Sequence, residues 1–161
     1  MEKTEHLISM TVENKFGVLA RVAGLFSARG FNIDSLSVAE TEDPGVSHMN
    51  ITVKGDEKIL EQIIKQLNKL IDIIKVQDLT SYDCLERELI LVRLSVLNRA
   101  SIMKIVEIFG SQVVDVGQKS VVVELIGDSH KIEITLKLLR PFGIKEIIRT
   151  GKVGIRKEGE K

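Results

Sequence analysis

"ENKFGVLARV", residues 13–22, marks the point where an extended segment gives way to an amphipathic helix. The segment before it, "HLISMTV" (6–12), alternates apolar and polar residues as a half-buried strand does. Gly17 lies at the joint, and Asn14 precedes it by three positions. The apolar residues that then recur at helical spacing are Val18, Leu19, Val22, Leu25 and Phe26. The stretch therefore predicts a strand, a tight turn and a helix.

The rest of the first half continues this alternation of strands and helices. "FNIDSLSVAE" (31–40) is again extended, and "SHMNITVKG" (47–55) alternates as a returning strand after a Pro-Gly turn. Asp56 is placed to cap a second amphipathic helix, "EKILEQIIKQLNKLI" (57–71), and "IIKVQDL" (73–79) follows as a strand. The predicted order is βαββαβ.

The second half repeats this order in pattern rather than in identity. Its predicted elements are "ELILVRLSV" (88–96), "RASIMKIVEIFG" (99–110), "QVVDVG" (112–117), "SVVVELIG" (120–127), "SHKIEITLKLLRPFG" (129–143) and "IKEIIRTG" (144–151). We therefore expect an α+β protein of two ferredoxin-like βαββαβ units, each an antiparallel sheet with two helices on one face. The expected domains are 1–80 and 81–161, joined at "TSYDC" (80–84), with "KVGIRKEGEK" (152–161) as a loose solvated tail.

Composition restricts the classes of function. The 161 residues are 43% hydrophobic and 29% charged, which is typical of an ordinary soluble globular protein. No apolar run approaches the roughly 18–20 residues of a membrane span, and "MEKTEH" (1–6) lacks a signal-peptide core, so we expect a cytoplasmic location. The single cysteine, Cys84, has no partner for an internal disulfide or a metal-ligand pair.

Catalytic, metal-binding and nucleic-acid-binding functions have little support. The histidines, His6, His48 and His130, are scattered over different predicted elements, and no motif typical of a nucleophile, a metal site or a phosphate loop is present. The βαββαβ topology also hosts metal-binding and RNA-binding modules. However, the net charge is zero and aromatic residues are only 4%, which argues against nucleic acid as a partner. We expect no catalytic residue and no metal ligand.

The turn at Gly17 has two interpretations. Because glycine lacks a Cβ, the free N–H groups at the helix start can approach an anion such as a carboxylate. Asn14 offers a donor and an acceptor, as the ammonium and carboxylate of a free amino acid require. Alternatively, Gly17 only permits a tight turn, Asn14 is a local cap and Asn32 a turn residue. An exposed sheet edge would favour pairing of two copies across a two-fold axis.

Longer stretches of the sequence resemble a known family. "ENKFGVLARVAGLFSARGFNIDSLSV" (13–38) resembles the start of an ACT domain, the amino-acid-sensing module. "RGFNIDSL" (29–36), "GDEKILEQIIKQLNKLIDIIKV" (55–76) and "ERELILV" (86–92) resemble the small regulatory subunit of acetohydroxyacid synthase, also called acetolactate synthase. This resemblance covers nearly the whole chain. It implies a non-catalytic homodimer that binds a branched-chain amino acid, usually valine, and confers activation and feedback inhibition on a separate catalytic subunit.

The resemblance also implies a set of effector-binding residues. Asn14 and Gly17 of one chain would face Asn32 and Ile33 of its partner across a dimer interface. Backbone donors or apolar walls would come from Phe16, Val18, Leu19 and Ile33. Lys15 and Phe16 differ from the smaller polar residues expected in this turn, which leaves open whether valine is the effector.

The second half lacks the glycine of this turn. "VLNRASIMKI" (96–105) has Asn98 but no residue equivalent to Gly17, so we expect a structural domain that contacts the catalytic subunit. "EREL" (86–89) is either a solvated strand end or part of that contact. The resemblance implies no cofactor on this chain, and thiamine diphosphate, magnesium and FAD on the catalytic subunit.

Overall fold

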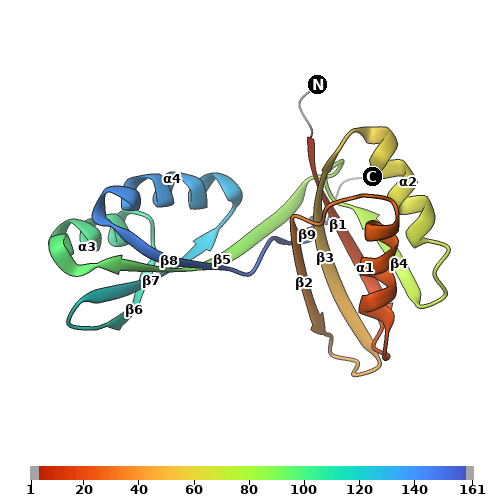
Figure 1. Cartoon of the computed structure of the whole chain (residues 1–161), viewed down its shortest axis with the longest axis horizontal. Coiled ribbons are helices and arrows are strands. Elements are labelled where there is room, and N and C mark those ends of the chain that lie inside the picture. The colour runs from red at the N-terminus through yellow and green to blue at the C-terminus, as the bar shows by residue number, and fades with distance from the viewer. Residues whose placement is uncertain (1–3, 159–161) are drawn as a thin grey trace. The chain divides into compact units, whose positions relative to one another are not determined.

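The chain forms two α+β units, and both can be followed in Figure 1. The computed structural model describes residues 4–158. The first unit contains the residues up to Leu85 together with those from Gly151 onward, and the second contains Glu86–Thr150. No helix in the described range is long and apolar enough to span a membrane.

The first unit confirms the predicted βαββαβ order. Its elements are β1 (Thr4–Glu13), α1 (Val18–Ala28), β2 (Ser35–Glu40), β3 (Val46–Gly55), α2 (Glu57–Leu67) and β4 (Ile73–Asp78). The strands are antiparallel in the order β2-β3-β1-β4, and both helices cover one face of the sheet (Figure 1). The strand β2 therefore lies at an edge of this sheet, as does β4.

The core of the first unit follows from the alternation read in the sequence. Every second residue of β1 and β3 points toward the helices and packs with their apolar faces. Fully buried members include Ile8, Met10, Val12, Phe26, Met49, Ile51, Ile63 and Leu67. The predicted cap of α2 is confirmed, since the Asp56 side chain accepts a hydrogen bond from the Ile59 N–H at 2.8 Å.

The second unit repeats the topology around a core of its own. Its elements are β5 (Cys84–Ser95), the 3-10 turn η1 (Val96–Asn98), α3 (Arg99–Ile108), β6 (Gln112–Val116), β7 (Ser120–Gly127), α4 (Ser129–Leu139), the 3-10 turn η2 (Arg140–Phe142) and β8 (Ile144–Arg149). The strand order is β6-β7-β5-β8, again antiparallel. Core residues include Ile90, Val92, Leu94, Ile102, Val123, Leu125 and Ile132. The predicted fold class is thus confirmed for both units.

The C-terminal segment departs from the prediction. Residues Val153–Arg156 form a further strand, β9, which pairs with β5 and belongs to the first unit. The Gly154 N–H donates to Asn50 Oδ1 at 3.3 Å, and a Cβ on Gly154 would lie 2.7 Å from a methyl carbon of Leu7. The loose solvated tail was therefore a wrong expectation for residues 152–158, and residues 159–161 lie outside the described range.

This segment also changes the expected division into domains. The compact units do not follow the limits 1–80 and 81–161, because the chain enters the second unit at Glu86 and returns to the first at Gly151. The reason is that the glycine-rich segment packs closely on the first sheet, and Lys152 forms an ion pair with Glu5. Such long-range pairing carries no periodic signal in the sequence.

The two sheets differ on the face that the helices leave uncovered, which we call the helix-free face. In the first sheet it is polar, because the residues that alternate with the core there are Ser9, Thr11, Ser37, His48, Asn50 and Gln77. In the second sheet it is mixed, because Leu89, Leu91, Val122, Ile126 and Ile148 lie there beside the charged Arg93, Glu124 and Glu146.

Candidate functional site

The start of α1 is open to a ligand. Gly17 is the residue before the helix and has φ 81° and ψ −6°, a left-handed conformation that strains residues with a Cβ. No side chain caps this helix, and its first turn contains no acidic residue. The Val18 N–H donates to the Lys15 carbonyl oxygen at 3.3 Å, so the N–H groups of Leu19 and Ala20 are the ones that keep their capacity to bind an anion.

An arginine adds positive charge beside this turn. Arg21 lies one turn into α1, and a Cβ on Gly17 would be 3.1 Å from its Nη1. The guanidinium also donates from Nε and Nη2 to Asp72 Oδ2, each at 2.8 Å. Asp72 is buried, so this pair fixes the arginine over the turn. Sequence reasoning missed Arg21, although its position four residues after Gly17 places it on the same side of the helix.

Asn14 connects the end of β1 to the hairpin between β2 and β3. Its side-chain nitrogen donates to the carbonyl oxygen of Pro44 at 2.9 Å and to Glu40 Oε2 at 3.1 Å. Within residues 4–158 its side-chain oxygen accepts no hydrogen bond, so one acceptor remains available. Asn14 thus stabilises the loop locally, as the alternative interpretation held, and it also leaves a polar group at the helix start.

The neighbours of Gly17 divide into exposed and buried side chains. Phe16 is fully exposed and Leu19 is 42% exposed, so both can form an apolar wall beside the turn. Val18 is buried in the core and can offer only its backbone. The exposed Lys15 forms an ion pair with Glu13 at 2.8 Å, and the hydrogen bond to Glu13 raises the pKa of Lys15.

The second pair of expected residues lies far from the first within one chain. Asn32 donates to Asp34 Oδ1 at 3.0 Å, and the Ile33 side chain packs against the core. Both precede β2, whereas Asn14 contacts Glu40, the last residue of β2. At about 3.3 Å per strand residue, about 20 Å separates the two pairs. One chain therefore does not bring Asn14 and Gly17 together with Asn32 and Ile33.

The second unit has no equivalent of the open helix start. Its first helix, α3, follows the 3-10 turn η1, and Asn98 before it has φ −137°, outside the left-handed region. The turn without a glycine thus also lacks the left-handed backbone of Gly17, and the role expected for this unit stays a prediction.

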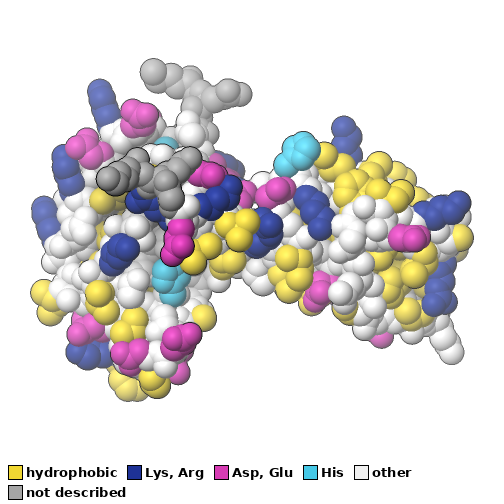
Figure 2. Space-filling model, turned by 180° about the vertical axis from the view of Figure 1, so that it is seen from behind, with side chains coloured by type: hydrophobic (Ala, Val, Ile, Leu, Met, Phe, Trp, Pro, Cys, Tyr) yellow, Lys and Arg dark blue, Asp and Glu magenta, His cyan; other side chains and the backbone are white. Residues whose placement is uncertain are grey.

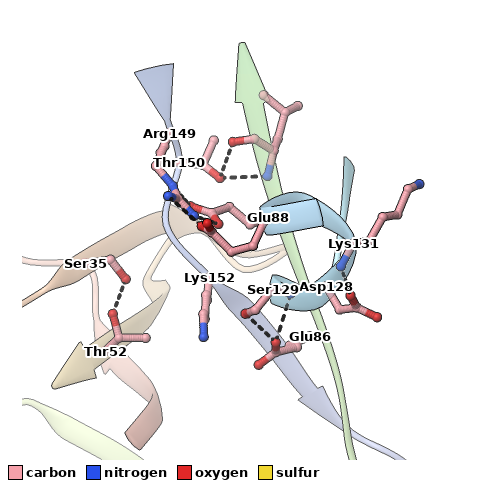
Figure 3. A network of polar contacts seen from close by, with 12 residues as sticks. Ser35, Thr52, Glu86, Glu88, Asp128, Ser129, Lys131, Arg149, Thr150 and Lys152 are labelled. Carbon is pink, nitrogen blue, oxygen red and sulfur yellow. Dashed lines mark hydrogen bonds and ion pairs between the residues drawn. The ribbon is translucent and has the colours of Figure 1, made fainter. Parts of the chain in front are cut away.

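"EREL" opens the second unit with a polar network rather than with a solvated strand end. Glu88 is buried and accepts from Arg149 Nη2 at 2.7 Å and from Nε at 2.9 Å, as Figure 3 shows. The hydrogen bond to Glu88 raises the pKa of Arg149 above its ordinary value. Glu86 accepts from Ser129 Oγ at 2.8 Å at the start of α4 (Figure 3). Both carboxylates therefore serve the fold of the second unit.

The histidines do not assemble into a metal site. His6 and His48 lie on β1 and β3 of the first unit, whereas His130 lies on α4 of the second. In the part of the chain that the structure describes, no group of three or more histidine, cysteine, aspartate or glutamate side chains could hold a metal ion.

Comparison with known families identifies the family of both halves of the chain. Residues 8–75 match the family described as "AHAS small subunit-like ACT domain", and residues 87–158 match "Small subunit of acetolactate synthase". The chain belongs to the acetolactate synthase small-subunit family. The resemblance read from the sequence is thereby confirmed.

Individual relatives match this small subunit over nearly their full length. A protein of Methanothermobacter thermautotrophicus, named "Probable acetolactate synthase small subunit", is 51% identical over 94% of this chain and 92% of its own length. The "Acetolactate synthase small subunit" of Aquifex aeolicus is 47% identical over 96% of this chain and 82% of its own. The crystal structure of the Thermotoga maritima acetolactate synthase small subunit has a TM-score of 0.88 and 40% identity, covering 98% and 99% of the two chains.

Proposed function

We propose that this chain is a regulatory subunit that binds a branched-chain amino acid, with valine as the first candidate, between two copies of its first unit. In this role it activates the catalytic subunit of acetolactate synthase and confers feedback inhibition on it in the cytoplasm. The observation that carries the proposal is the uncapped start of α1 behind the left-handed Gly17, beside Arg21. Family membership supports the same role.

A two-fold arrangement of edge strands would complete the site. If β2 pairs antiparallel with β2 of a second copy, the start of one strand meets the end of the other. Asn32 of the partner subunit and Ile33 of the partner subunit would then approach the hairpin end where Asn14 lies. The separation of about 20 Å within one chain, which one ligand cannot bridge, is what a site shared by two chains requires.

The chemistry of the turn suits a free amino acid. The carboxylate would accept hydrogen bonds from the first N–H groups of α1 and face Arg21, while the ammonium would donate to the Asn14 side-chain oxygen and to Glu40. Leu19 and Phe16 would contact the aliphatic side chain. Burying a valine side chain contributes about 1.5–3 kcal/mol, and each hydrogen bond to its charged groups a similar amount before the costs of binding. A net dissociation constant between about 1 µM and 1 mM is reasonable.

Calorimetric titration of the chain with valine, leucine and isoleucine tests this proposal. We expect saturable heat with at least one of them, and no saturable heat at millimolar concentration would reject the effector site. Gly17→Asp should abolish binding, because it places a negative charge where the ligand carboxylate belongs. The matched control is Gly110→Asp after α3 in the second unit, where φ is also positive, at 57°, and a Cβ would meet no atom within 4 Å. Binding should survive in that variant.

The contact with the catalytic subunit is proposed for the second unit. Hydrophobic side chains gather on its surface in Figure 2, and its helix-free face carries Leu91, Val122 and Ile148. An exposed apolar sheet face is typical of a protein interface. Thiamine diphosphate, magnesium and FAD would be bound by the partner, so this chain alone should not turn over pyruvate.

Activation measurements test this second part. Leu91→Glu should reduce the activation of the catalytic subunit by this chain about tenfold or more, while valine binding to the chain itself is retained. Ile108→Glu, at an apolar position at the end of α3 that is more exposed than Leu91, is the control and should change activation little. Equal losses in both variants would place the contact elsewhere.

A further inference from the structure

Arg21 beside the Gly17 turn is held by Asp72 along one edge of its guanidinium. Nε and Nη2 both donate to Asp72 Oδ2 at 2.8 Å, and Asp72 is only 7% exposed. The carbonyl oxygen of Asp72 also accepts from the Glu13 N–H at 2.9 Å, which ties this residue to the end of β1. The carboxylate that holds the arginine is therefore itself fixed by the fold.

The other edge of the Arg21 guanidinium has donors to spare. Among residues 4–158 no group accepts a hydrogen bond from Nη1, and the arginine side chain is 48% exposed, so a ligand can reach it. The five N–H donors of an arginine have a fixed planar geometry, in which an N–H of Nη1 and the second N–H of Nη2 lie parallel at one edge. This edge matches the two oxygens of a carboxylate.

Gly17 makes room for this edge. A Cβ at position 17 would lie 3.1 Å from Arg21 Nη1, which is closer than ordinary van der Waals contact. The glycine therefore allows the guanidinium to lie over the same turn that leaves the N–H groups of Leu19 and Ala20 without a partner. Backbone donors and a charged side-chain donor thus meet at one turn.

The second unit contains a similar arginine whose Nη1 does have a partner. Arg149 donates from Nε and Nη2 to the buried Glu88, and its Nη1 donates to Glu133 Oε1 at 3.4 Å. A second carboxylate thus meets Nη1 in the second unit, whereas none meets Nη1 of Arg21 within the described part of the chain. The corresponding position at Arg21 is open to a carboxylate from outside the chain.

We propose that Asp72 is a positioning residue of the effector site. It holds Arg21 by one edge, so that Nη1 and Nη2 at the other edge form two hydrogen bonds with the carboxylate of the bound amino acid. This pairing makes the site selective for a free carboxylate over the amide of the same amino acid. The inference rests on the proposed function and names the side chain that recognises the charge of the ligand.

Calorimetry with an amino acid and its amide tests the role of Arg21. The probes are whichever of valine, leucine and isoleucine the unmodified chain binds most tightly, and the amide of that amino acid, which keeps the ammonium and the side chain but has no carboxylate. In Arg21→Gln the affinity for the amino acid should fall about ten- to hundredfold, because two hydrogen bonds to a charged group are lost. The affinity for the amide, weaker from the start, should stay unchanged.

A pair of substitutions tests whether Asp72 acts through the arginine. Asp72→Asn should weaken amino-acid binding in the unmodified chain but cause no further loss in Arg21→Met, where there is no guanidinium left to position. A further loss there would show a structural role only and would overturn the positioning role. If Arg21→Met alone fails to fold, the double variant, which leaves no buried carboxylate unpaired, should still lose the preference that Arg21 gives to the acid over the amide. An undiminished preference would overturn the inference.

The matched control is the similar pair of the second unit. Glu88→Gln with Arg149→Met also removes a buried carboxylate together with its arginine and should leave amino-acid binding unchanged. Equal losses in the two double variants would show a general effect of stability and would overturn the inference. The absence of saturable heat with all three amino acids in the unmodified chain would instead reject the effector site itself. Binding that persists undiminished in Arg21→Gln would overturn only the roles of Arg21 and Asp72.

Discussion

The first and second units share one topology but differ at the start of their first helix. In the first unit Gly17 adopts a left-handed conformation and leaves the N–H groups of α1 uncapped. In the second unit the 3-10 turn η1 leads directly into α3, and no residue at this turn is left-handed. The same βαββαβ framework thus has a left-handed glycine before its first helix in one copy and a 3-10 turn there in the other, so topology alone does not assign function.

The units also differ on the helix-free faces of their sheets. In the first, Ser9 Oγ and His48 Nε2 lie 2.8 Å apart, and β9 covers part of this polar face. In the second, the corresponding positions are Leu91 on β5 and Val122 on β7. Both units nevertheless contain one buried carboxylate held by a half-exposed arginine, Asp72 with Arg21 and Glu88 with Arg149. The carboxylate–arginine pairs common to both units stabilise the fold. The units differ instead at the start of the first helix and on the helix-free face, where a ligand or a partner could bind.

The largest effect is expected from removing the C-terminal segment that packs on the first unit. Deleting residues 151–161 would expose Leu7 and Leu79, which are 6% and 1% exposed, and should destabilise the first unit by about 3 kcal/mol or more. Hydrogen exchange measured by mass spectrometry reports each unit separately. Exchange should accelerate in β1 and β3 and remain unchanged in β7. Equal acceleration in both units would contradict the assignment of this segment to the first.

Removing Arg149, the partner of the buried Glu88, should have the next largest effect on stability. Arg149→Ala leaves the buried Glu88 carboxylate without its partner and should destabilise the second unit by about 2–3 kcal/mol, less than for a fully buried pair because Arg149 is partly exposed. Arg93→Ala breaks an exposed pair with Glu146 and should cost less than about 1 kcal/mol. Urea unfolding of both variants measures the difference. Similar losses would mean that burial of Glu88 is unimportant.

A smaller effect should distinguish the two helix starts. Gly17→Ala forces a residue with a Cβ into a left-handed conformation and should cost about 1–2 kcal/mol. Asn98→Ala, at the corresponding turn, meets no such strain and should cost less than about 0.5 kcal/mol. Thermal unfolding of the two variants tests this, and a greater loss for Asn98→Ala would contradict the conformational argument.

The smallest effect is a pH dependence confined to the first unit. Burial lowers the pKa of His48 below its ordinary value of 6.5, because the charged ring is poorly solvated there. The associated stability is fully present above pH 6.5, declines as the pH falls toward the lowered pKa, and levels off below it. His48→Gln should flatten this decline in unfolding measurements between pH 7.5 and 5. The exposed His130 of α4 is the control, since His130→Gln should leave the profile unchanged.

Periodic features of the fold were predictable from the sequence, and long-range pairings were not. The alternation in β1 and the spacing in α2 identified these elements, and Asp56 identified a helix start correctly. The end of α2 was predicted too late, at residue 71, because apolar residues continue past Leu67 while the Lys69 N–H already turns back to the Gln66 carbonyl oxygen. The strand β9 was missed because its four residues, one of which is Gly154, are too few to show a period.

In the candidate site, too, local features were predictable from the sequence, whereas contacts between distant residues were not. The tight turn at Gly17 depends on local chain geometry, so residue type and position were enough to predict it. Arg21 was missed because its role depends on Asp72, which comes from a distant part of the sequence. The pairing of Asn14 with Asn32 of the partner subunit stays a prediction, since it depends on a contact between two chains.

The course of the chain has a consequence for biosynthesis. Because Gly154 packs on Leu7 and donates to Asn50, the first unit is built from residues made before the second unit and from residues made after it. Every residue of the second unit leaves the ribosome before this closing strand does. The inserted unit can therefore complete its folding during synthesis, whereas the N-terminal unit must wait for release of the segment that covers its sheet.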